Sequence, residues 1–509
     1  MASSRPPFSS DQPPDDDDTL LDAAEAAEEV IPDQDHPMDS DDASDTDSAN
    51  PLDQDEEEIQ LQNDSIAHFD AHRDSVFCIA QHPTIPNTIA TGGGDDTTYI
   101  FSTNPSSPRL LPKSYESNPD PSSTRASLLT SAKLTGHTDS VNALTYTLPD
   151  GKYLLSGGLD GQLRAYSTTD PSYPLLAAAQ EVPEINFVIP SPHPSYPNTI
   201  ALGASDGSVW VYTVDPPDSP LRILQAYYLH TASCTAGAWS PDGKLLATVS
   251  EDGSLYVWDP FGEAAAVGID AGGAQAIVGL TASDQRFAVE GGLYSVAVAP
   301  SGAFVVVGGA EGMIRVVGLP RVGGTGVSTT AGKKGAGSKS KSGGGRKAGA
   351  ANGSGGGSAG QAGAVLASLQ VQSEGVETLS FASPPLSLLG AGSLDGSIVL
   401  FDTAHNFAVR RHIREAHEEY AVVQVDFSRE NGQEHLLTSC GLDGAVRRWD
   451  TRGGTAAAGQ GLVGEWRGHR GEGEGGGVLG FVQGGKEGKI ITAGDDGVVL
   501  VFGEDKGQL

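Results

Sequence analysis

Three sets of residues have the composition of a hydrolase triad: a histidine, a hydroxyl residue and an aspartate. They are His137, Ser156 and Asp160; His230, Thr248 and Asp252, with Trp258; and His417, Ser439 and Asp443, with Trp449. A single such set could carry out nucleophilic catalysis. A set that recurs along the chain is instead what buried polar groups need to satisfy one another. The sequence shows no nucleophile elbow, phosphate-binding loop or metal-ligand cluster, so we predict no enzyme activity, no cofactor and no metal site.

The aspartates of these sets lie in short turns that recur along the chain. Clear copies include "LLSGGLDGQLRAYS", "LLATVSEDGSLYVWD", "LLTSCGLDGAVRRWD" and "IITAGDDGVVLVF". Each copy reads as an apolar strand, a small-residue step, an Asp-Gly turn and a second strand, which is the chemistry of a β-hairpin. A further strand, such as "DSVFCIAQHP", precedes most copies. The pattern predicts an all-β fold built from repeats.

These repeats resemble WD repeats, each of which forms one four-stranded blade of a β-propeller. The resemblance covers about residues 65–503, and "WD" pairs occur at 258–259 and 449–450. We predict eight blades, with seven as the alternative, and expect "DSIAHFDAH" to add the strand that closes the ring. We count units at 75–101, 139–167, 184–212, 233–259, 292–317, 375–402, 420–449 and 477–503.

The resemblance also implies that the His, Ser/Thr and Asp residues form structural hydrogen-bonded sets within the blades. The turn aspartates that should have this role are Asp96, Asp160, Asp206, Asp252, Asp395, Asp443 and Asp496.

The composition divides the chain further. Residues 1–64 contain 22 acidic residues and one basic residue, and we predict a disordered acidic tail before a propeller at 65–509. A Gly/Ser/Lys-rich insertion at 318–364 has seven bases and no acid, and we expect it to be disordered as well. The net charge of −35 disfavours direct binding of nucleic acid and favours basic partners. The sequence contains no run of about 18 apolar residues, so we predict no membrane span.

Some polar residues are not explained by the blade structure. The position before the turn aspartate should open onto one face of the propeller, the top face, and so should a position near the start of each inner strand. Acidic residues at or near these positions are Asp495, Glu377, Glu251, Asp95 and Glu184, and apolar ones are Phe77, Tyr294, Leu394 and Leu442. An acidic rim with apolar members suits a basic amphipathic peptide. Scattered surface charge is the alternative interpretation.

Three stretches resemble one WD-repeat family in particular: "HFDAHRDSVFCIAQHPTIPNTIATGGGDD", "EVPEINFVIPSPHPSYPNTIALGASDGSVWVY" and "ITAGDDGVVLVF". This is the fungal ribosome-assembly family that chaperones the large-subunit ribosomal protein L-ten (uL-sixteen family), and angio-associated migratory cell protein is its animal relative. The resemblance implies an acidic top face that holds the basic N-terminus of this client until late 60S ribosome assembly. It also implies that Glu377 and Asp495 are the key carboxylates.

Two other functions are compatible with the repeat pattern. A general WD-repeat scaffold or a ubiquitin-ligase adaptor would have the same fold, because propellers support unrelated functions. We expect a monomer in the cytoplasm, with the nucleus as a second compartment. Three widely spaced cysteines (Cys78, Cys234 and Cys440) fit a reducing compartment and form no disulfide framework.

Overall fold

The computed structural model describes residues 63–104, 126–215, 219–269, 275–322, 361–453, 461–471, 476–485 and 488–503. All of them belong to one compact unit, residues 60–509. The predicted acidic tail lies outside the described residues, apart from Asn63 and Asp64. Residues 323–360 of the predicted insertion also lie outside the described residues. The two ends of the insertion are described, and the side chains of Leu319 and Val322 there are buried.

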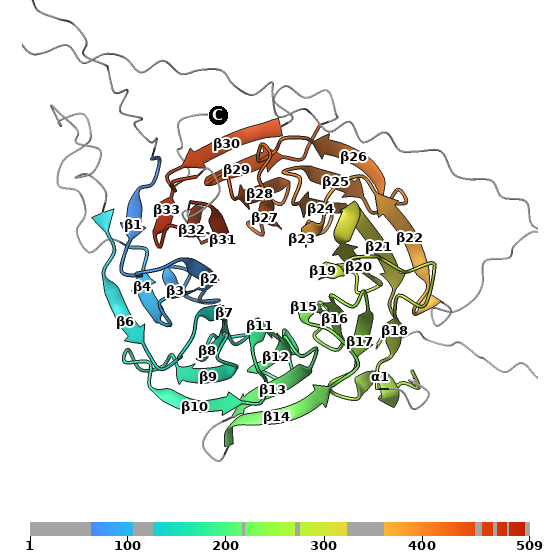
Figure 1. The fold of residues 1–509 in the computed structure, drawn as a ribbon, viewed down its shortest axis with the longest axis horizontal. Coiled ribbons are helices and arrows are strands. Elements are labelled where there is room, and N and C mark those ends of the chain that lie inside the picture. The colour runs from blue at the N-terminus through green and yellow to red at the C-terminus, as the bar shows by residue number, and fades with distance from the viewer. Residues whose placement is uncertain are drawn as a thin grey trace, which may run out of the picture. The chain divides into compact units, whose positions relative to one another are not determined.

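Eight β-sheets surround one axis and form the predicted eight-bladed propeller (Figure 1). The innermost strands are β2 (Val76–Gln81), β7 (Val141–Tyr146), β11 (Ile185–Pro190), β15 (Cys234–Trp239), β19 (Leu293–Val298), β23 (Val376–Phe381), β27 (Val422–Phe427) and β31 (Val478–Gly484). The second strands are β3 (Thr88–Gly93), β8 (Tyr153–Gly158), β12 (Thr199–Ala204), β16 (Leu246–Ser250), β20 (Phe304–Gly309), β24 (Leu388–Ser393), β28 (Leu436–Gly441) and β32 (Lys489–Gly494).

The outer half of each blade follows the same order. The third strands are β4 (Thr98–Ser102), β9 (Gln162–Ser167), β13 (Val209–Asp215), β17 (Leu255–Trp258), β21 (Met313–Gly318), β25 (Ile398–Asp402), β29 (Ala445–Asp450) and β33 (Val499–Phe502). The outermost strands of blades one to seven are β6 (Thr130–Leu134), β10 (Leu175–Gln180), β14 (Ser219–Tyr227), β18 (Val278–Leu280), β22 (Val365–Gln370), β26 (Ala408–Ile413) and β30 (Leu462–Arg467).

The ring is closed by residues from the two ends of the repeat array. Strand β1 (Ala67–Phe69) lies within the predicted "DSIAHFDAH" stretch and pairs antiparallel with β33, with Ala67 opposite Val501. The short strand β5 (Ala126–Ser127), which we did not predict, pairs parallel with β1 and makes the eighth sheet five-stranded. The predicted closing strand is therefore confirmed, and it joins the first and last blades beside β33 (Figure 1).

Each blade buries its two faces against its neighbours. The buried apolar side chains form eight clusters, and every cluster joins two adjacent blades. The small-residue step of the repeat has a packing reason. A Cβ on Gly157 would lie 2.7 Å from Ile185 of the next blade, and a Cβ on Gly392 would lie 2.7 Å from Val422. Glycine at these places lets the inner strand of the following blade approach closely.

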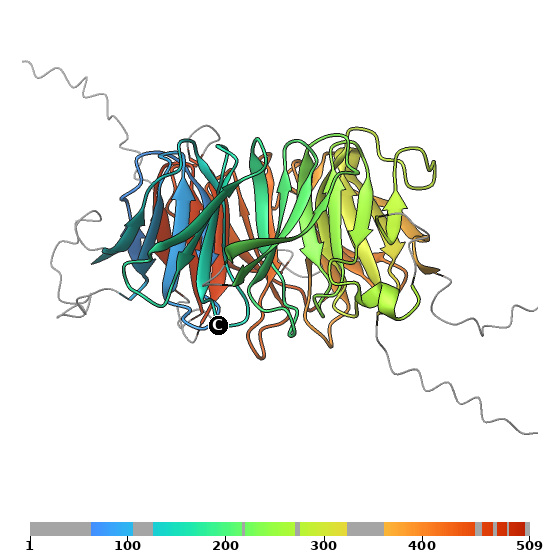
Figure 2. The same cartoon turned by 90° about the horizontal axis from the view of Figure 1, so that it is seen from below.

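The strands run between two faces, which Figure 2 shows from the side. We use "top face" for the face with the turns between the second and third strands. The opposite lower face carries the links between the first and second strands, and the four-residue helix α1 (Glu263–Ala266). A short 3-10 helix, η2 (Ala310–Gly312), forms the blade-five turn on the top face. No helix of the described residues is long and apolar enough to cross a membrane.

The closing strand yields a stability prediction. Phe69 is almost fully buried and stacks on Phe101 of blade one, with 4.3 Å between the ring centroids. We expect Phe69→Ala to lower the free energy of unfolding by about 3–5 kcal/mol, the usual cost of removing a buried aromatic ring.

The matched control is Ile66→Ala, because Ile66 is 43% exposed and immediately precedes β1. We expect it to change stability by about 0.5 kcal/mol or less. Urea denaturation of the two variants checks the prediction, and equal small losses would show that β1 does not hold the ring closed.

Candidate functional site

The predicted triad-like sets are buried hydrogen-bonded networks within single blades. In blade two, His137 Nδ1 lies 3.0 Å from Asp160 Oδ1, and His137 Nε2 lies 2.7 Å from the Ser156 hydroxyl. In blade seven, His417 links Asp443 (2.9 Å) to Ser439 (2.8 Å) in the same way. The fully buried Ser156 and Ser439 have no open path to a substrate, so the geometry is that of polar satisfaction.

The charge state of these networks follows from burial and pairing. Burial lowers the pKa of His417, which favours the neutral imidazole. Burial alone would raise the pKa of Asp443, but hydrogen bonds from His417 and the ion pair with Arg447 lower it to about 2. An ionised turn aspartate held by a neutral histidine and by turn N–H groups has no spare capacity for a ligand.

Blade four includes an additional hydroxyl residue in this network. In blade four the link from His230 to Asp252 passes through Ser254, because His230 Nδ1 bonds to the Ser254 hydroxyl (2.6 Å) and lies 4.0 Å from Asp252. The hydroxyl of Thr248 joins His230 to Trp258, as expected from the sequence.

The remaining turn aspartates are also bonded to their own turns. Asp395 accepts from the N–H groups of Ser373 and Ser397, and Asp206 accepts from the N–H and hydroxyl of Ser208. Asp496 is 3.0 Å from His469 Nδ1.

The prediction for blade one is wrong by one residue. The structural aspartate is Asp95, whose carboxylate lies 3.0 Å from His72 Nδ1 and accepts from the N–H groups of Arg73 and Thr97. Asp96 takes the left-handed conformation (φ 59°) that a glycine has in the equivalent turns, for example Gly161. Asp95 is therefore not a top-face ligand, and Asp96 is not the turn aspartate.

A signal for the correct assignment was present in the sequence. His72 and Asp95 are separated by 23 residues, as are His137 and Asp160.

The residue before the turn aspartate, or before Glu311 in blade five, is held in the same way in all eight blades. Its N–H donates to the carbonyl that immediately precedes the inner strand of its own blade, as Asp495 N–H does to Gly477 O (2.9 Å) and Leu394 N–H to Gly375 O (3.0 Å). We call these positions the turn slots. They are occupied by Gly94, Leu159, Ser205, Glu251, Ala310, Leu394, Leu442 and Asp495.

The second predicted position is a β-bulge in every blade. The register between the first and second strands shifts after the first inner residue, so the next residue has no partner across the ladder. A bulge redirects a side chain, here toward the top of the ring axis. We call these positions the bulge slots. Their residues are Phe77, Asn142, Asn186, Thr235, Tyr294, Glu377, Val423 and Leu479.

Most polar bulge-slot side chains are used between blades. Asn142 donates to the carbonyls of Ile185 and Asn186, Asn186 donates to Cys234 O, and Thr235 donates to Leu293 O. Glu377 differs from them. Among the described residues we find no hydrogen bond or ion pair to its carboxylate, although the side chain is partly buried. Burial raises the pKa of Glu377 above the usual carboxyl value.

Glu377 lies among the other predicted residues of blades four to six. A Cβ on Gly375 would be 3.4 Å from both Glu377 Oε1 and Leu394 Cδ1, so the carboxylate and the 43% exposed leucine are neighbours. Burial, and then the negative charges of Glu251 and Glu377, raise the pKa of the Tyr294 phenol, which donates to Gly291 O. These residues form an acidic and apolar surface on the top face.

Asp495 lies at the junction of blades eight and one. Its side chain accepts from the Ser75 hydroxyl (2.6 Å), and Ser75 immediately precedes the strand that carries Phe77. Leu442 of blade seven lies beside Gly477 of blade eight, because a Cβ on Gly477 would be 2.6 Å from Leu442 Cδ2. The exposed Glu184 lies on the same face, where its carbonyl accepts from the turn slot of blade three.

The structure also brings acidic residues to the top face that we did not predict there. Asp96, Asp139 and the exposed Asp74 lie on the top face of blades one and two. Burial, and then repulsion by Asp139, raise the pKa of Asp96. A Cβ on Gly94 would be 2.9 Å from Asp74 Cγ, which places Asp74 beside a turn slot. No group of metal-ligating side chains occurs among the residues that the structure describes.

Comparison with known proteins agrees with this architecture. The family model for the WD domain, G-beta repeat, matches residues 63–102, 128–167 and 220–259. One similar structure is the crystal structure of Chaetomium thermophilum Sqt1 bound to the N-terminus of the ribosomal protein L10. Its sequence is 49% identical to this chain, and the TM-score between the two structures is 0.71. That similarity covers 87% of this chain and all of the other.

Two curated relatives are more distant. The ribosome assembly protein SQT1 of Saccharomyces cerevisiae is 28% identical over 211 residues, which span 40% of this chain and 43% of the relative. The human angio-associated migratory cell protein is 24% identical and aligns with 86% of this chain and 80% of its own length.

The two neighbouring carboxylates of blade eight provide a direct test of the division into structural and site residues. We expect Asp496→Ala to lower the free energy of unfolding by about 1–3 kcal/mol, because it leaves Nδ1 of the buried His469 without its carboxylate partner. Asp495→Ala should cost about 1 kcal/mol or less, since its side chain bonds to the partly buried Ser75 hydroxyl and not to a buried histidine. Urea denaturation measures both. Equal losses would mean that both carboxylates are structural.

Proposed function

The chain belongs to the Sqt1 family of WD-repeat proteins, and from this premise we propose that it is a dedicated chaperone for the ribosomal protein L10 in ribosome assembly. Its top face would bind the basic N-terminal segment of the newly made client and release it to the large subunit late in assembly. L10 is the large-subunit client that the sequence resemblance implies.

The observation that carries the proposal is the state of Glu377. Its anionic form is penalised by burial, and within the described residues no cation compensates it. A partly desolvated carboxylate gains more from a bound Lys or Arg than a fully hydrated one, because water competes less for the charge. The bulge slot holds this carboxylate at the top of the ring axis, where neighbouring slots are apolar or already bonded.

The rest of the top face supplies attraction and apolar contact. Glu251, Glu184 and Asp495 add negative charge over several blades, which would steer a basic segment toward the face. Phe77, Tyr294, Leu394 and Leu442 would contact its apolar side chains, as anchors do at other interfaces. Occupation of this surface would keep a basic, RNA-binding protein from nucleic acid and from aggregation.

The proposal describes a binding protein and not an enzyme. The hydroxyl groups that could serve as nucleophiles, such as those of Ser156 and Ser439, are fully buried and bonded to their histidines. Cytoplasmic action, with the nucleus as a second compartment, is also part of the proposal. The three cysteines are free thiols, and burial raises the pKa of each, which suits a reducing compartment.

Calorimetric binding of a synthetic peptide with the N-terminal sequence of L10 tests the proposal. We expect the full chain to bind the peptide, and we expect Glu377→Lys and Asp495→Lys each to weaken binding at least about tenfold, or about 1.4 kcal/mol. Affinity should fall between about 50 and 300 mM salt, because exposed charge pairs are screened.

The control is Asp150→Lys, which makes the same change of charge at an exposed side chain on the lower face. It should change affinity less than about threefold, since it lies far from the site along the strands. Absence of binding by the folded wild-type chain would contradict the chaperone function and favour a general scaffold. Intact binding by both reversals would move the client to another surface.

A further inference from the structure

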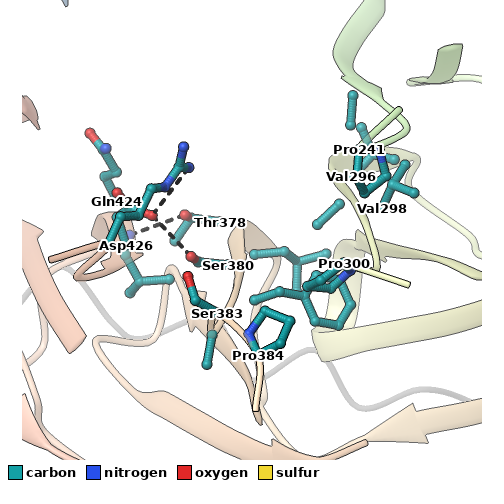
Figure 3. A pocket seen from close by; sticks show the side chains of 17 residues that line it. Pro241, Val296, Val298, Pro300, Thr378, Ser380, Ser383, Pro384, Gln424 and Asp426 are labelled. Carbon is teal, nitrogen blue, oxygen red and sulfur yellow. Dashed lines mark hydrogen bonds and ion pairs between the residues drawn. The ribbon is translucent and has the colours of Figure 1, made fainter. Parts of the chain in front are cut away.

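A cleft of about 660 Å³ lies along the lower part of the inner strands of blades four to seven (Figure 3). Its two walls differ in chemistry. One wall is apolar and includes Pro241, Val296, Val298 and Pro300, and the other is polar and includes Thr378, Ser380, Gln424 and Asp426. Figure 3 shows the two groups facing each other across the cleft.

The polar wall is held rigidly by bonds between blades. The Ser380 hydroxyl donates to Asp426 Oδ1 (3.1 Å) and accepts from Phe427 N–H, and Thr378 accepts from Val425 N–H. Gln424 bonds both main-chain groups of Phe481 in the next blade. These bonds cover the inner sheet edges of blades seven and eight and fix the direction of each polar group.

The apolar wall leaves a sheet edge uncovered. Strand β19 is the edge of its sheet, and among the described residues no side chain bonds to the main chain of Val296–Val298. An extended peptide could add to such an edge through its own main chain. Pro241 and Pro300 flank this edge and supply apolar contact.

Asp426 gives the cleft a preference for a cation. Its side chain is 27% exposed, and burial raises its pKa. The nearest cationic group in the described residues, the guanidinium of Arg429, is 3.9 Å away on a side chain that is 84% exposed. An exposed ion pair of this kind is weak, so the partly buried carboxylate of Asp426 is only partly compensated.

The cleft and the proposed client site lie along the same inner strands. Strand β19 carries Tyr294 near its top and Val296–Val298 below it, and β23 carries Glu377 near its top and Ser380 below it. At about 3.3 Å per residue, Ser380 lies roughly 10 Å below Glu377. Solvent reaches the strands between the two levels, because Thr235–Trp239 and Glu377–Leu379 are all partly exposed.

We propose that the client peptide continues from the top face down the ring axis in an extended conformation. There it would place an apolar side chain against Val296 and Val298 and a Lys or Arg side chain against Asp426. The proposal rests on the function proposed above and adds a second cation-binding position to it. Glu377 and Asp426 are then successive positions for two basic residues of one client.

Photo-crosslinking tests this path in the full chain. A photoreactive benzophenone amino acid replaces Val298 in the cleft, Leu394 on the top face or, as a control, the 46% exposed Val409 on an outermost strand. The probe is a set of synthetic L10 N-terminal peptides, shortened stepwise from the C-terminal end. We expect crosslinks at 394 with all peptides that bind, at 298 only with the longer ones, and none at 409.

Affinity gives a second readout. Asp426→Asn keeps an oxygen for the Ser380 bond and should weaken the longer peptides by about three- to tenfold while leaving the shorter ones unchanged. Asp150→Asn removes the same charge from the lower face and should have no effect on either. The melting temperature of Asp426→Asn should not fall, because a partly buried charge is removed.

The outcomes separate the two proposals. Crosslinking at 394 without any at 298, together with unchanged affinity of Asp426→Asn, would overturn the axial path and leave the chaperone function intact. Absence of both crosslinks and of binding by the wild-type chain would overturn the chaperone function, and the axial path with it.

Discussion

The structure depends on one constraint: every blade has two apolar faces that only its neighbours can cover. The eight buried clusters at the eight blade junctions are the result. An open array would leave two faces exposed, so the ring has to close, and the pairing of β1 with β33 closes it. Closure makes the top ends of eight inner strands converge on one axis. A site can then collect side chains from blades that are distant in sequence, such as Glu377 and Asp495.

The polar residues of the propeller divide into two groups with opposite effects on stability. Turn aspartates such as Asp160 and Asp443 are bonded within their blades and stabilise the fold. Glu377 opposes it. Its pKa is raised on folding, so the folded chain binds that proton more tightly than the unfolded chain does. The ionised form therefore costs stability near neutral pH; this cost shrinks as the pH falls through the raised pKa and is gone below the ordinary carboxyl pKa. A residue retained at such a cost is most simply explained by binding.

Much of this arrangement could be predicted from the sequence because the same strand and turn pattern recurs in most blades. The recurring Asp-Gly turn and the strand before it predict the blades, and a strand-like stretch ahead of the first repeat predicts the closure. The prediction for blade one failed because "GGGDDTT" offers two adjacent aspartates with no glycine after them. Asp96 takes the left-handed conformation that a glycine has in the equivalent turns. The β-bulges, strand β5 and the cleft beside Asp426 could not be predicted, since they arise from contacts between blades.

The central claim is that the partly buried charge of Glu377 has no cationic partner within the described part of the fold. This lowers the stability of the fold, and a basic residue of the client supplies the missing partner. The most direct measurement determines L10-peptide affinity and melting temperature together for Glu377→Gln, a substitution that keeps the size of the side chain and removes its charge. The account predicts that affinity falls at least about fivefold while the melting temperature stays the same or rises. Unchanged affinity would contradict it, and so would a fall in melting temperature, which would make Glu377 a structural residue.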